Sequence, residues 1–242
     1  MVKEEMAMTN MLSKSLSMAL GMLKEKVGVA GEIETQSFIT ELNEATNIND
    51  TVEHQLKHFQ QAIPTMTKSQ KRQLLTLVVY ISQFKHMLKP STNMTTMIPL
   101  ANAFVQQAKS VEDKKFGYLA MGALVENHGD LAYHCMNTIV KDVSGKDPKV
   151  IVMALDVISK IRDLDLLSQM CQCVRQRLKH TNASVRTKCF VVLHSMFKIS
   201  PKLISDPEDQ IRAAVEDSNP EVMAASLPYL EGLLQVEQLV IF

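Results

Sequence analysis

A pattern that returns four times between Asp113 and Leu233 constrains the fold of this chain more than any other feature. Each copy starts with Asp or Asn. An apolar residue follows three positions later, a small or polar-small residue four positions after that, and an aliphatic residue four positions further on. The copies begin at Asp113, Asp147, Asn182 and Asn219, so their starts are separated by 34, 35 and 37 positions. A near-constant period in this range indicates a helical repeat array.

The residue types within each copy predict how the repeating unit folds. Asp and Asn are preferred N-caps, because a side-chain oxygen accepts hydrogen bonds from the free amides of the first helical turn. Pro148 and Pro220 fall one residue later, where a helix tolerates a missing N–H. The apolar, small and aliphatic residues lie on one helix face, and Ala154, Cys189 and Ser226 at its centre allow a neighbouring helix to approach closely. We therefore expect an all-α fold, a right-handed α-solenoid of stacked HEAT/armadillo-like repeats.

Composition and charge limit the classes of partner. The chain has 242 residues, 46% of them hydrophobic, with 26 basic and 26 acidic residues and no formal net charge. A neutral chain lacks the basic surface that supplies most of the affinity for nucleic acid. No apolar run is long enough to span a bilayer, and the lysine-bearing N-terminus lacks the pattern of a secretory signal. We expect a soluble, intracellular protein that does not bind nucleic acid.

The remaining segments also have helical periodicity. Residues 1–30 place apolar side chains on one face. This segment is either an amphipathic helix that contacts a membrane or partner, or an end helix that caps the array. The acidic residues among its lysines favour the end helix. Asp50 or Thr51 is expected to cap the helix that follows a loop at 46–50. Further helices are expected over residues 32–45, 52–63, 68–88, 95–109, 130–143, 165–179 and 200–216, the last broken by Pro201 and Pro207.

We expect a single array of helical repeats rather than separate domains. Residues 1–242 form one trunk segment, with N-terminal helices over 1–50, early helical pairs over 51–112 and the four-copy region over 113–235. The pattern stops after Leu234 without a polar capping unit, which predicts the start of a longer array. An apolar end face of this kind predicts poor solubility of the isolated chain.

Two histidine arrangements are candidates for metal binding or catalysis. His54 and His58 are four residues apart, but Gln55 stands where the H-E-x-x-H pattern has glutamate. His194 and Ser195 are adjacent, so on a helix their side chains point about 100° apart and do not form a nucleophile–base pair. The simpler interpretation is a pair of surface histidines, with His194 in a hydrogen-bonded core or groove position.

The four cysteines, Cys135, Cys171, Cys173 and Cys189, fit reduced, partly buried thiols. Cys171 and Cys173 point about 200° apart on a helix, which disfavours a shared zinc ion. We therefore expect no catalytic, cofactor-binding or metal-binding residues and no cofactor. A non-enzyme is the leading interpretation, and an all-α metal-dependent enzyme that uses the histidines is the alternative.

Several stretches of the repeat region resemble adaptin large chains, the trunk subunits of clathrin-type adaptor complexes. Lys114–Ala120 is similar to the K-R-x-G-Y-L-[GA] stretch of that family, and Asn137–Val143 to its N-[ST]-[LI]-x-x-D-L stretch. Val185–Cys189 resembles its V-R-x-K-A segment. Glu221–Leu227 is similar to a segment of the epsilon chain of the fourth adaptor-protein complex. These stretches follow one another in the family's order.

The resemblance implies a structural subunit of an adaptor complex that sorts cargo into vesicles. The implied partners are an adaptor small chain, a medium chain, a second large chain and a small GTPase. The implied location is the cytosolic face of trans-Golgi or endosomal membranes, with peripheral association. The hinge and appendage of adaptin large chains have no counterpart here, and the N-terminal region lacks the basic cluster that some members use for phosphoinositides. The alternative is a different helical-repeat scaffold, of the coatomer or nuclear-transport kind, that binds another protein.

Overall fold

The computed structural model describes residues 48–83, 97–127, 129–204 and 207–240, and every regular element in these ranges is helical. The early helices are α3 (Ile48–Ala62), α4 (Lys68–Gln83) and α5 (Met97–Gln107). The four copies of the sequence pattern form α6 (Val111–Asn127), α8 (Pro148–Ile158), α10 (Ala183–Ile199) and α12 (Pro220–Val240). Between them lie η1 (Gly129–Cys135), α7 (Met136–Val143), α9 (Leu164–Gln176), η2 (Arg177–Lys179), η3 (Pro201–Leu203) and α11 (Glu208–Val215). The predicted all-α class is confirmed.

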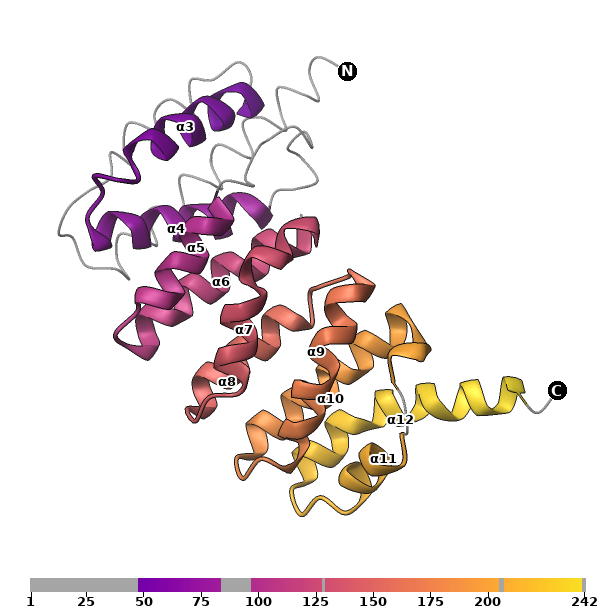
Figure 1. The fold of residues 1–242 in the computed structure, drawn as a ribbon. Coiled ribbons are helices and arrows are strands. Elements are labelled where there is room, and N and C mark those ends of the chain that lie inside the picture. The colour runs from indigo at the N-terminus through magenta and orange to yellow at the C-terminus, as the bar shows by residue number, and fades with distance from the viewer. Residues whose placement is uncertain (1–47, 84–96, 128, 205–206, 241–242) are drawn as a thin grey trace.

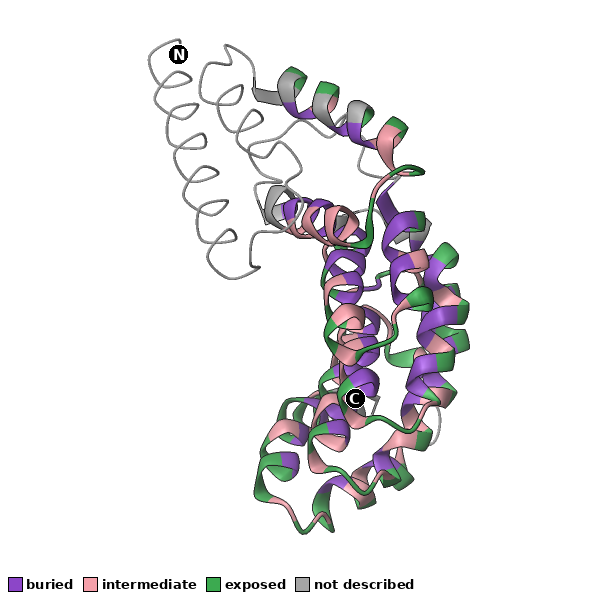
Figure 2. Cartoon of the chain, turned by 90° about the vertical axis from the view of Figure 1, so that its left-hand side faces the viewer, coloured by how far each residue is buried: buried purple, intermediate pink, exposed green. Residues whose placement is uncertain are grey.

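The helices stack in two layers. The first layer holds α4, α6, α8, α10 and α12, each in contact with the next (Figure 1). The second layer holds α5, η1 with α7, α9 and α11, and each of these helices packs on its neighbour in the first layer. Buried residues face the seam between the two columns of helices (Figure 2). This arrangement is the α-solenoid that the sequence period predicts.

Three of the four predicted N-caps are confirmed. The side chain of Asp147 accepts a hydrogen bond from the backbone N–H of Lys149 at 2.9 Å. Asn182 caps α10 and Asn219 caps α12 in the same way. Pro148 and Pro220 are the first residues of their helices, as predicted.

The prediction for Asp113 is wrong, because Ser110 precedes α6 and acts as its cap. The backbone N–H of Asp113 donates to Ser110 Oγ at 3.2 Å, and the Ser110 hydroxyl donates to Asp113 Oδ2 at 2.8 Å. Serine is as good an N-cap as aspartate, and an acidic residue three positions later stabilises the first turn. The starts of the four helices are therefore spaced by 37, 35 and 37 positions, more evenly than the pattern suggested.

The predicted small residues at the centre of each stripe are confirmed as core positions. Ala120, Ala154 and Cys189 are fully buried, and Ser226 is 1% exposed. The aliphatic residues four positions later, Leu124, Ile158 and Leu193, are buried in the same core, and Leu230 is half-buried against it. The layers can therefore approach closely at the middle of each repeat.

Apart from the four helices that begin the copies, several expected helices are shifted or interrupted. Helix α3 begins at Ile48, so Asp50 lies inside the helix and is not its cap. The apolar centre of α4 is buried at Leu74, Leu75, Leu77 and Val78, as predicted. The segment over 200–216 is broken into η3 and α11, as its prolines predict. The predicted helices over 1–30 and 32–45 lie outside the described residues.

We expect Asp147→Ala to lower the free energy of unfolding by about 1 kcal/mol, because the first turn of α8 loses its side-chain acceptor. Asp147→Asn keeps an acceptor at the same place and serves as the matched control. Urea unfolding followed by circular dichroism measures both. Equal loss in the two variants would show that the carboxylate charge, and not the cap, is what matters at this position.

Candidate functional site

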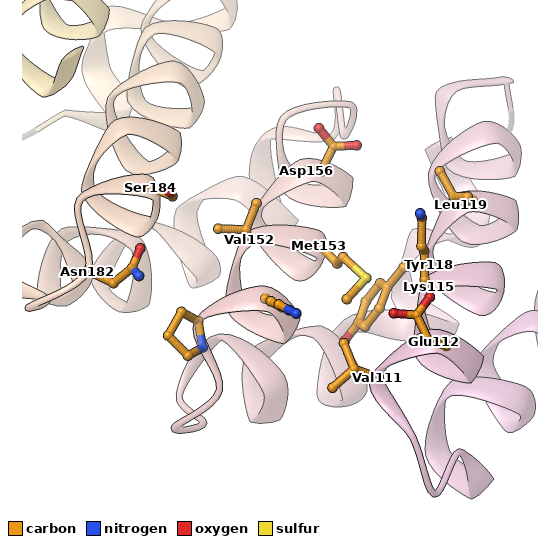
Figure 3. A pocket seen from close by; sticks show the side chains of 12 residues that line it. Val111, Glu112, Lys115, Tyr118, Leu119, Val152, Met153, Asp156, Asn182 and Ser184 are labelled. Atoms are coloured by element: carbon orange, nitrogen blue, oxygen red, sulfur yellow. The ribbon is translucent and has the colours of Figure 1, made fainter.

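A groove of about 590 Å³ is lined by residues of α6 and α8 and by the start of α10 (Figure 3). Successive helices contribute residues at equivalent positions. Counted from the first helical residue, positions two, five and nine are Glu112, Lys115 and Leu119 on α6, and Lys149, Val152 and Asp156 on α8. Asn182 and Ser184 at the start of α10 complete this wall. The groove is therefore a product of the repeat itself.

The lining of the groove suits a protein partner better than a reaction. Its apolar surface comes from Leu119, which is 45% exposed, together with half-buried Val152 and Met153. Lys115 and Lys149 lie at its edge and are exposed. No histidine or cysteine is among the residues that line it. An apolar floor with a charged edge is the usual composition of a protein–protein contact.

A buried polar cluster holds the α6 wall of the groove in place. Lys114 Nζ lies 2.5 Å from Asp142 Oδ2, and the hydroxyl of Tyr118 donates to the same oxygen at 2.7 Å. Asp142 belongs to α7, so the cluster joins one helix pair to the next. Burial, together with the hydrogen bond to Asp142, raises the pKa of Tyr118 far above its ordinary value, so its hydroxyl remains a donor.

Gly117, between these two residues, allows α5 and α6 to touch. A Cβ atom at this position would lie 2.5 Å from Val105 Cγ2 and 3.2 Å from the carbonyl oxygen of Ala101. The first distance is far below van der Waals contact and the second is tight, so a side chain at this position would require the Val105 side chain and the backbone of α5 to shift. The Lys-x-x-Gly-Tyr stretch is therefore a joint between helices.

The Val-Arg-x-Lys stretch of α10 forms two further joints. Arg186 makes a bidentate ion pair with Asp217, with Nε at 2.6 Å from Oδ2 and Nη2 at 2.8 Å from Oδ1. The two side chains are only 14% and 6% exposed. Lys188 reaches back and forms a short ion pair with Asp156 of α8. These residues link α10 to the repeats on both sides.

The structure describes the two histidine arrangements only in part. His54 is exposed, and the side chain of His58 lies outside the described residues. His194 is half-buried, and its Nδ1 atom is buried without a hydrogen-bond partner among the described residues. Burial, and then the charge of Lys198, lowers the pKa of His194. The hydroxyl of Ser195 donates to the carbonyl oxygen of Ser159 at 3.1 Å and so points elsewhere.

The four cysteines are free thiols in this structure, three of them buried. Cys171 Sγ donates to the carbonyl oxygen of Leu203 and Cys173 Sγ to that of Met170, so the two thiols face different partners. Burial raises the pKa of Cys135 to about 12 and that of Cys173 to about 11. Thiols with such pKa values are poor nucleophiles at neutral pH.

Two further features are absent from the part of the chain that the structure describes. Within it, no three histidine, cysteine or acidic side chains are grouped as a metal site would require. Likewise, none of the helices placed there has both the length and the hydropathy to cross a bilayer.

The groove was missed by sequence reasoning, because periodicity separates core from surface without distinguishing one exposed face from another. A signal was present in the chain. Leu119 is apolar yet exposed, and it lies off the buried stripe of α6. A large apolar residue off the core face is a signal of an interaction surface.

Asp217→Asn is expected to lower the free energy of unfolding by about 3 kcal/mol at pH 7, because it leaves the largely buried guanidinium of Arg186 without its counter-charge. Arg186 holds the pKa of Asp217 below its ordinary value. The contribution of the pair is therefore full at neutral pH and is lost as the pH falls through the folded-state pKa. The difference between wild type and variant should shrink below about pH 4.

Urea unfolding at pH 7 and at lower pH tests this expectation. The matched control is Glu53→Gln, which removes the exposed ion pair with Lys57 and should cost less than about 0.5 kcal/mol. A difference between Asp217→Asn and wild type that does not change with pH would contradict the role given to the ion pair.

Known proteins resemble this chain in sequence and in fold. The model of the "Adaptin N terminal region" family matches residues 44–240. AP-4 complex subunit epsilon-1 of Homo sapiens is 27% identical over 68% of this chain and 14% of its own length. AP-4 complex subunit epsilon of Arabidopsis thaliana is 25% identical over 71% and 18%. AP-1 complex subunit beta of Dictyostelium discoideum is 27% identical over 56% and 15%.

This chain therefore spans less than a fifth of the length of these relatives. Among solved structures, an engineered protein superposes with a TM-score of 0.54 at 9% identity, over 95% of this chain and 91% of its own. This likeness concerns the fold alone. The family match covers most of the chain, and the relatives include adaptin large chains, as the Lys114–Ala120 and Val185–Cys189 stretches led us to expect. The chain belongs to the family of the adaptin N-terminal region.

Proposed function

We propose that this chain is a structural, non-enzymatic part of a clathrin-type adaptor complex that acts in intracellular protein transport and vesicle-mediated cargo sorting. Family membership and the similarity to AP-4 epsilon and AP-1 beta subunits support the proposal. The fold supports it too, because a solenoid adds surface with each repeat without a new core. The proposal does not depend on any catalytic or cofactor-binding residue.

The observation that carries the proposal is the groove over α6, α8 and α10. Its residues come from the same positions of consecutive repeats, so it follows the array and can receive an elongated or folded partner. The helices that form it are joined by the Lys114–Tyr118–Asp142 cluster and by the Lys188–Asp156 pair. A surface fixed in this way before binding loses little conformational freedom when a partner docks.

The hypothesis of an adaptor subunit also implies which proteins bind this chain. We propose an adaptor small chain as the protein that docks on the first layer, within a heterotetramer that also holds a medium chain and a second large chain. A small GTPase would recruit the complex to the cytosolic face of trans-Golgi or endosomal membranes, where it associates peripherally. In this proposal residues 1–242 act as one trunk segment, with the four-copy region over 113–235 providing the groove.

Co-expression of residues 1–242 with the adaptor small chain of the same organism tests this proposal. Size-exclusion chromatography should show co-elution at a one-to-one ratio. Separate elution, with the repeat protein folded and soluble by itself, would contradict it and favour an unrelated helical-repeat scaffold.

Variants of the groove localise the contact. Leu119→Glu and Lys149→Glu change exposed side chains, so the fold should survive, and each should weaken the complex by at least about tenfold. Leu164→Glu is the matched control, because Leu164 is 49% exposed but lies on α9 in the second layer. Unchanged binding in both groove variants would exclude the groove as the docking surface even if the complex forms.

A further inference from the structure

The groove lined by α6, α8 and the start of α10 has unbalanced positive charge at its edge. Lys115 of α6 and Lys149 of α8 are exposed, and neither has an ion-pair partner among the described residues. Within that part of the chain, Glu112 of α6 is the one lining carboxylate that is also unpaired. The unpaired charge at the groove is therefore positive on balance, although the whole chain has no formal net charge.

The other carboxylate of the lining, Asp156, is already neutralised. Lys188 of α10 forms a short ion pair with one of its oxygens, and Lys160 Nζ lies 3.8 Å from the other. Two ammonium groups surround this one carboxylate, so Asp156 does not offset the charge of Lys115 or Lys149.

The start of α10 adds to the positive surface. The N-terminus of a helix carries a partial positive charge of about half an elementary charge. The carboxylate of Asp147 caps α8 and offsets that charge, whereas the cap of α10 is the neutral amide of Asn182. Ser184, the second residue of α10, is exposed and lines the groove. The α10 end of the groove therefore also favours a negatively charged ligand.

The apolar floor and the size of the groove limit what can occupy it. Val152 and Met153 of α8 lie between the side chains of α6 and those of α10 (Figure 3). A volume of about 590 Å³ is in the range of pockets that hold a drug-sized ligand, so the groove accepts a few side chains and not a folded domain.

The spacing of the helices sets the length of the occupant. Helices that pack side by side lie about 8–10 Å apart, so the distance from α6 to α10 is roughly 16–20 Å. An extended chain rises about 3.3 Å per residue, and about six residues therefore cover this distance. A short extended segment matches the groove in length and in width.

We propose that the groove binds a short, extended and acidic segment of a partner protein, which lies across α8 and reaches from α6 to the start of α10. An apolar side chain of the segment packs on Leu119, Val152 and Met153, and its carboxylates pair with Lys115 and Lys149. The use of the groove as the docking surface rests on the proposed function, and the chemistry of the occupant goes beyond it.

The same observations disfavour two other classes of acidic ligand. Nucleic acid is bound through many phosphate contacts at once, and two unpaired lysines are too few for that. A bilayer surface cannot enter a concave groove to cover the apolar floor, whereas a peptide can. Complementary charge at the edge of an apolar contact is also the usual means by which proteins select a partner.

Selection from a random peptide library displayed on phage, with the full chain as bait, tests the proposal. The selected peptides should have a net negative charge and at least one large apolar residue. Synthetic copies should bind with a Kd that rises at least about fivefold between about 50 mM and about 500 mM NaCl, because salt screens exposed charge pairs. Fluorescence anisotropy measures the Kd.

Charge-reversal variants localise the peptide. Lys115→Glu/Lys149→Glu should weaken binding of the selected peptides by at least about tenfold. Lys141→Glu/Lys202→Glu is the matched control, because it makes the same change of net charge at exposed lysines of α7 and η3, outside the groove. The control should bind like wild type.

Two further variants separate charge from damage to the fold. Glu112→Gln removes the carboxylate that repels the segment, so binding should tighten by about threefold. Ser184→Glu should weaken binding by a similar factor, although glutamate in the first turn of a helix stabilises that helix. A gain of affinity in one variant, and a loss in a variant that is no less stable, cannot come from unfolding.

Several results would overturn the proposal. They are the absence of any enriched peptide, enrichment of neutral or basic peptides, and an affinity that Lys115→Glu/Lys149→Glu leaves unchanged. Capture of phosphatidylserine vesicles without enrichment of peptides would assign the surface to a membrane and would overturn it as well.

The adaptor proposal is tested separately. If acidic peptides bind the groove but the adaptor small chain elutes by itself, the chemistry of the groove stands and the adaptor proposal fails. If the small chain co-elutes and its affinity is insensitive to salt and to Lys115→Glu/Lys149→Glu, the adaptor proposal stands and the acidic segment is excluded.

Discussion

The stacking of each first-layer helix on the next is the interaction on which the rest of this structure depends. A single helix pair has too little apolar surface to fold by itself, so each repeat is stable only against its neighbours. Fully buried Ala154 and Cys189, at the centre of their helices, let the layers approach to close contact. The capped helix starts keep this spacing nearly constant, and the groove surface repeats because the packing beneath it repeats.

Polar joints fix how the repeats are aligned. An apolar stripe alone tolerates sliding of one helix along another, because many positions offer similar burial. The bidentate Arg186–Asp217 pair and the Lys114–Tyr118–Asp142 cluster bond well only in one alignment. Both use residues from stretches that resemble adaptin large chains. The residues of these stretches hold the helices of the trunk together. The resemblance to adaptin large chains in these stretches therefore reflects the packing of the fold and not a binding site.

The repeat period, the helix class and most caps could be predicted from the sequence, because each depends on residues close together in the chain. Ser110 was missed as a cap since Asp113, three residues later, is an equally good candidate by type. The joints could not be predicted, because Arg186 and Asp217 are 31 positions apart and their pairing depends on the stacking angle. The groove was missed for the same reason: its walls belong to three separate helices.

The groove over α6, α8 and α10 has a mechanical consequence. The curvature of a solenoid follows from the small rotation between successive repeats, so small changes of the angle at each junction bend the array. A partner that lies across three repeats touches two such junctions at once, so it fits only one local curvature and resists departure from it. Binding and bending are thereby coupled, and by reciprocity a force that straightens or curls the array changes the affinity of the groove. In a rigid globular domain with a comparable groove, the affinity for the partner would not change with a force on the ends of the chain.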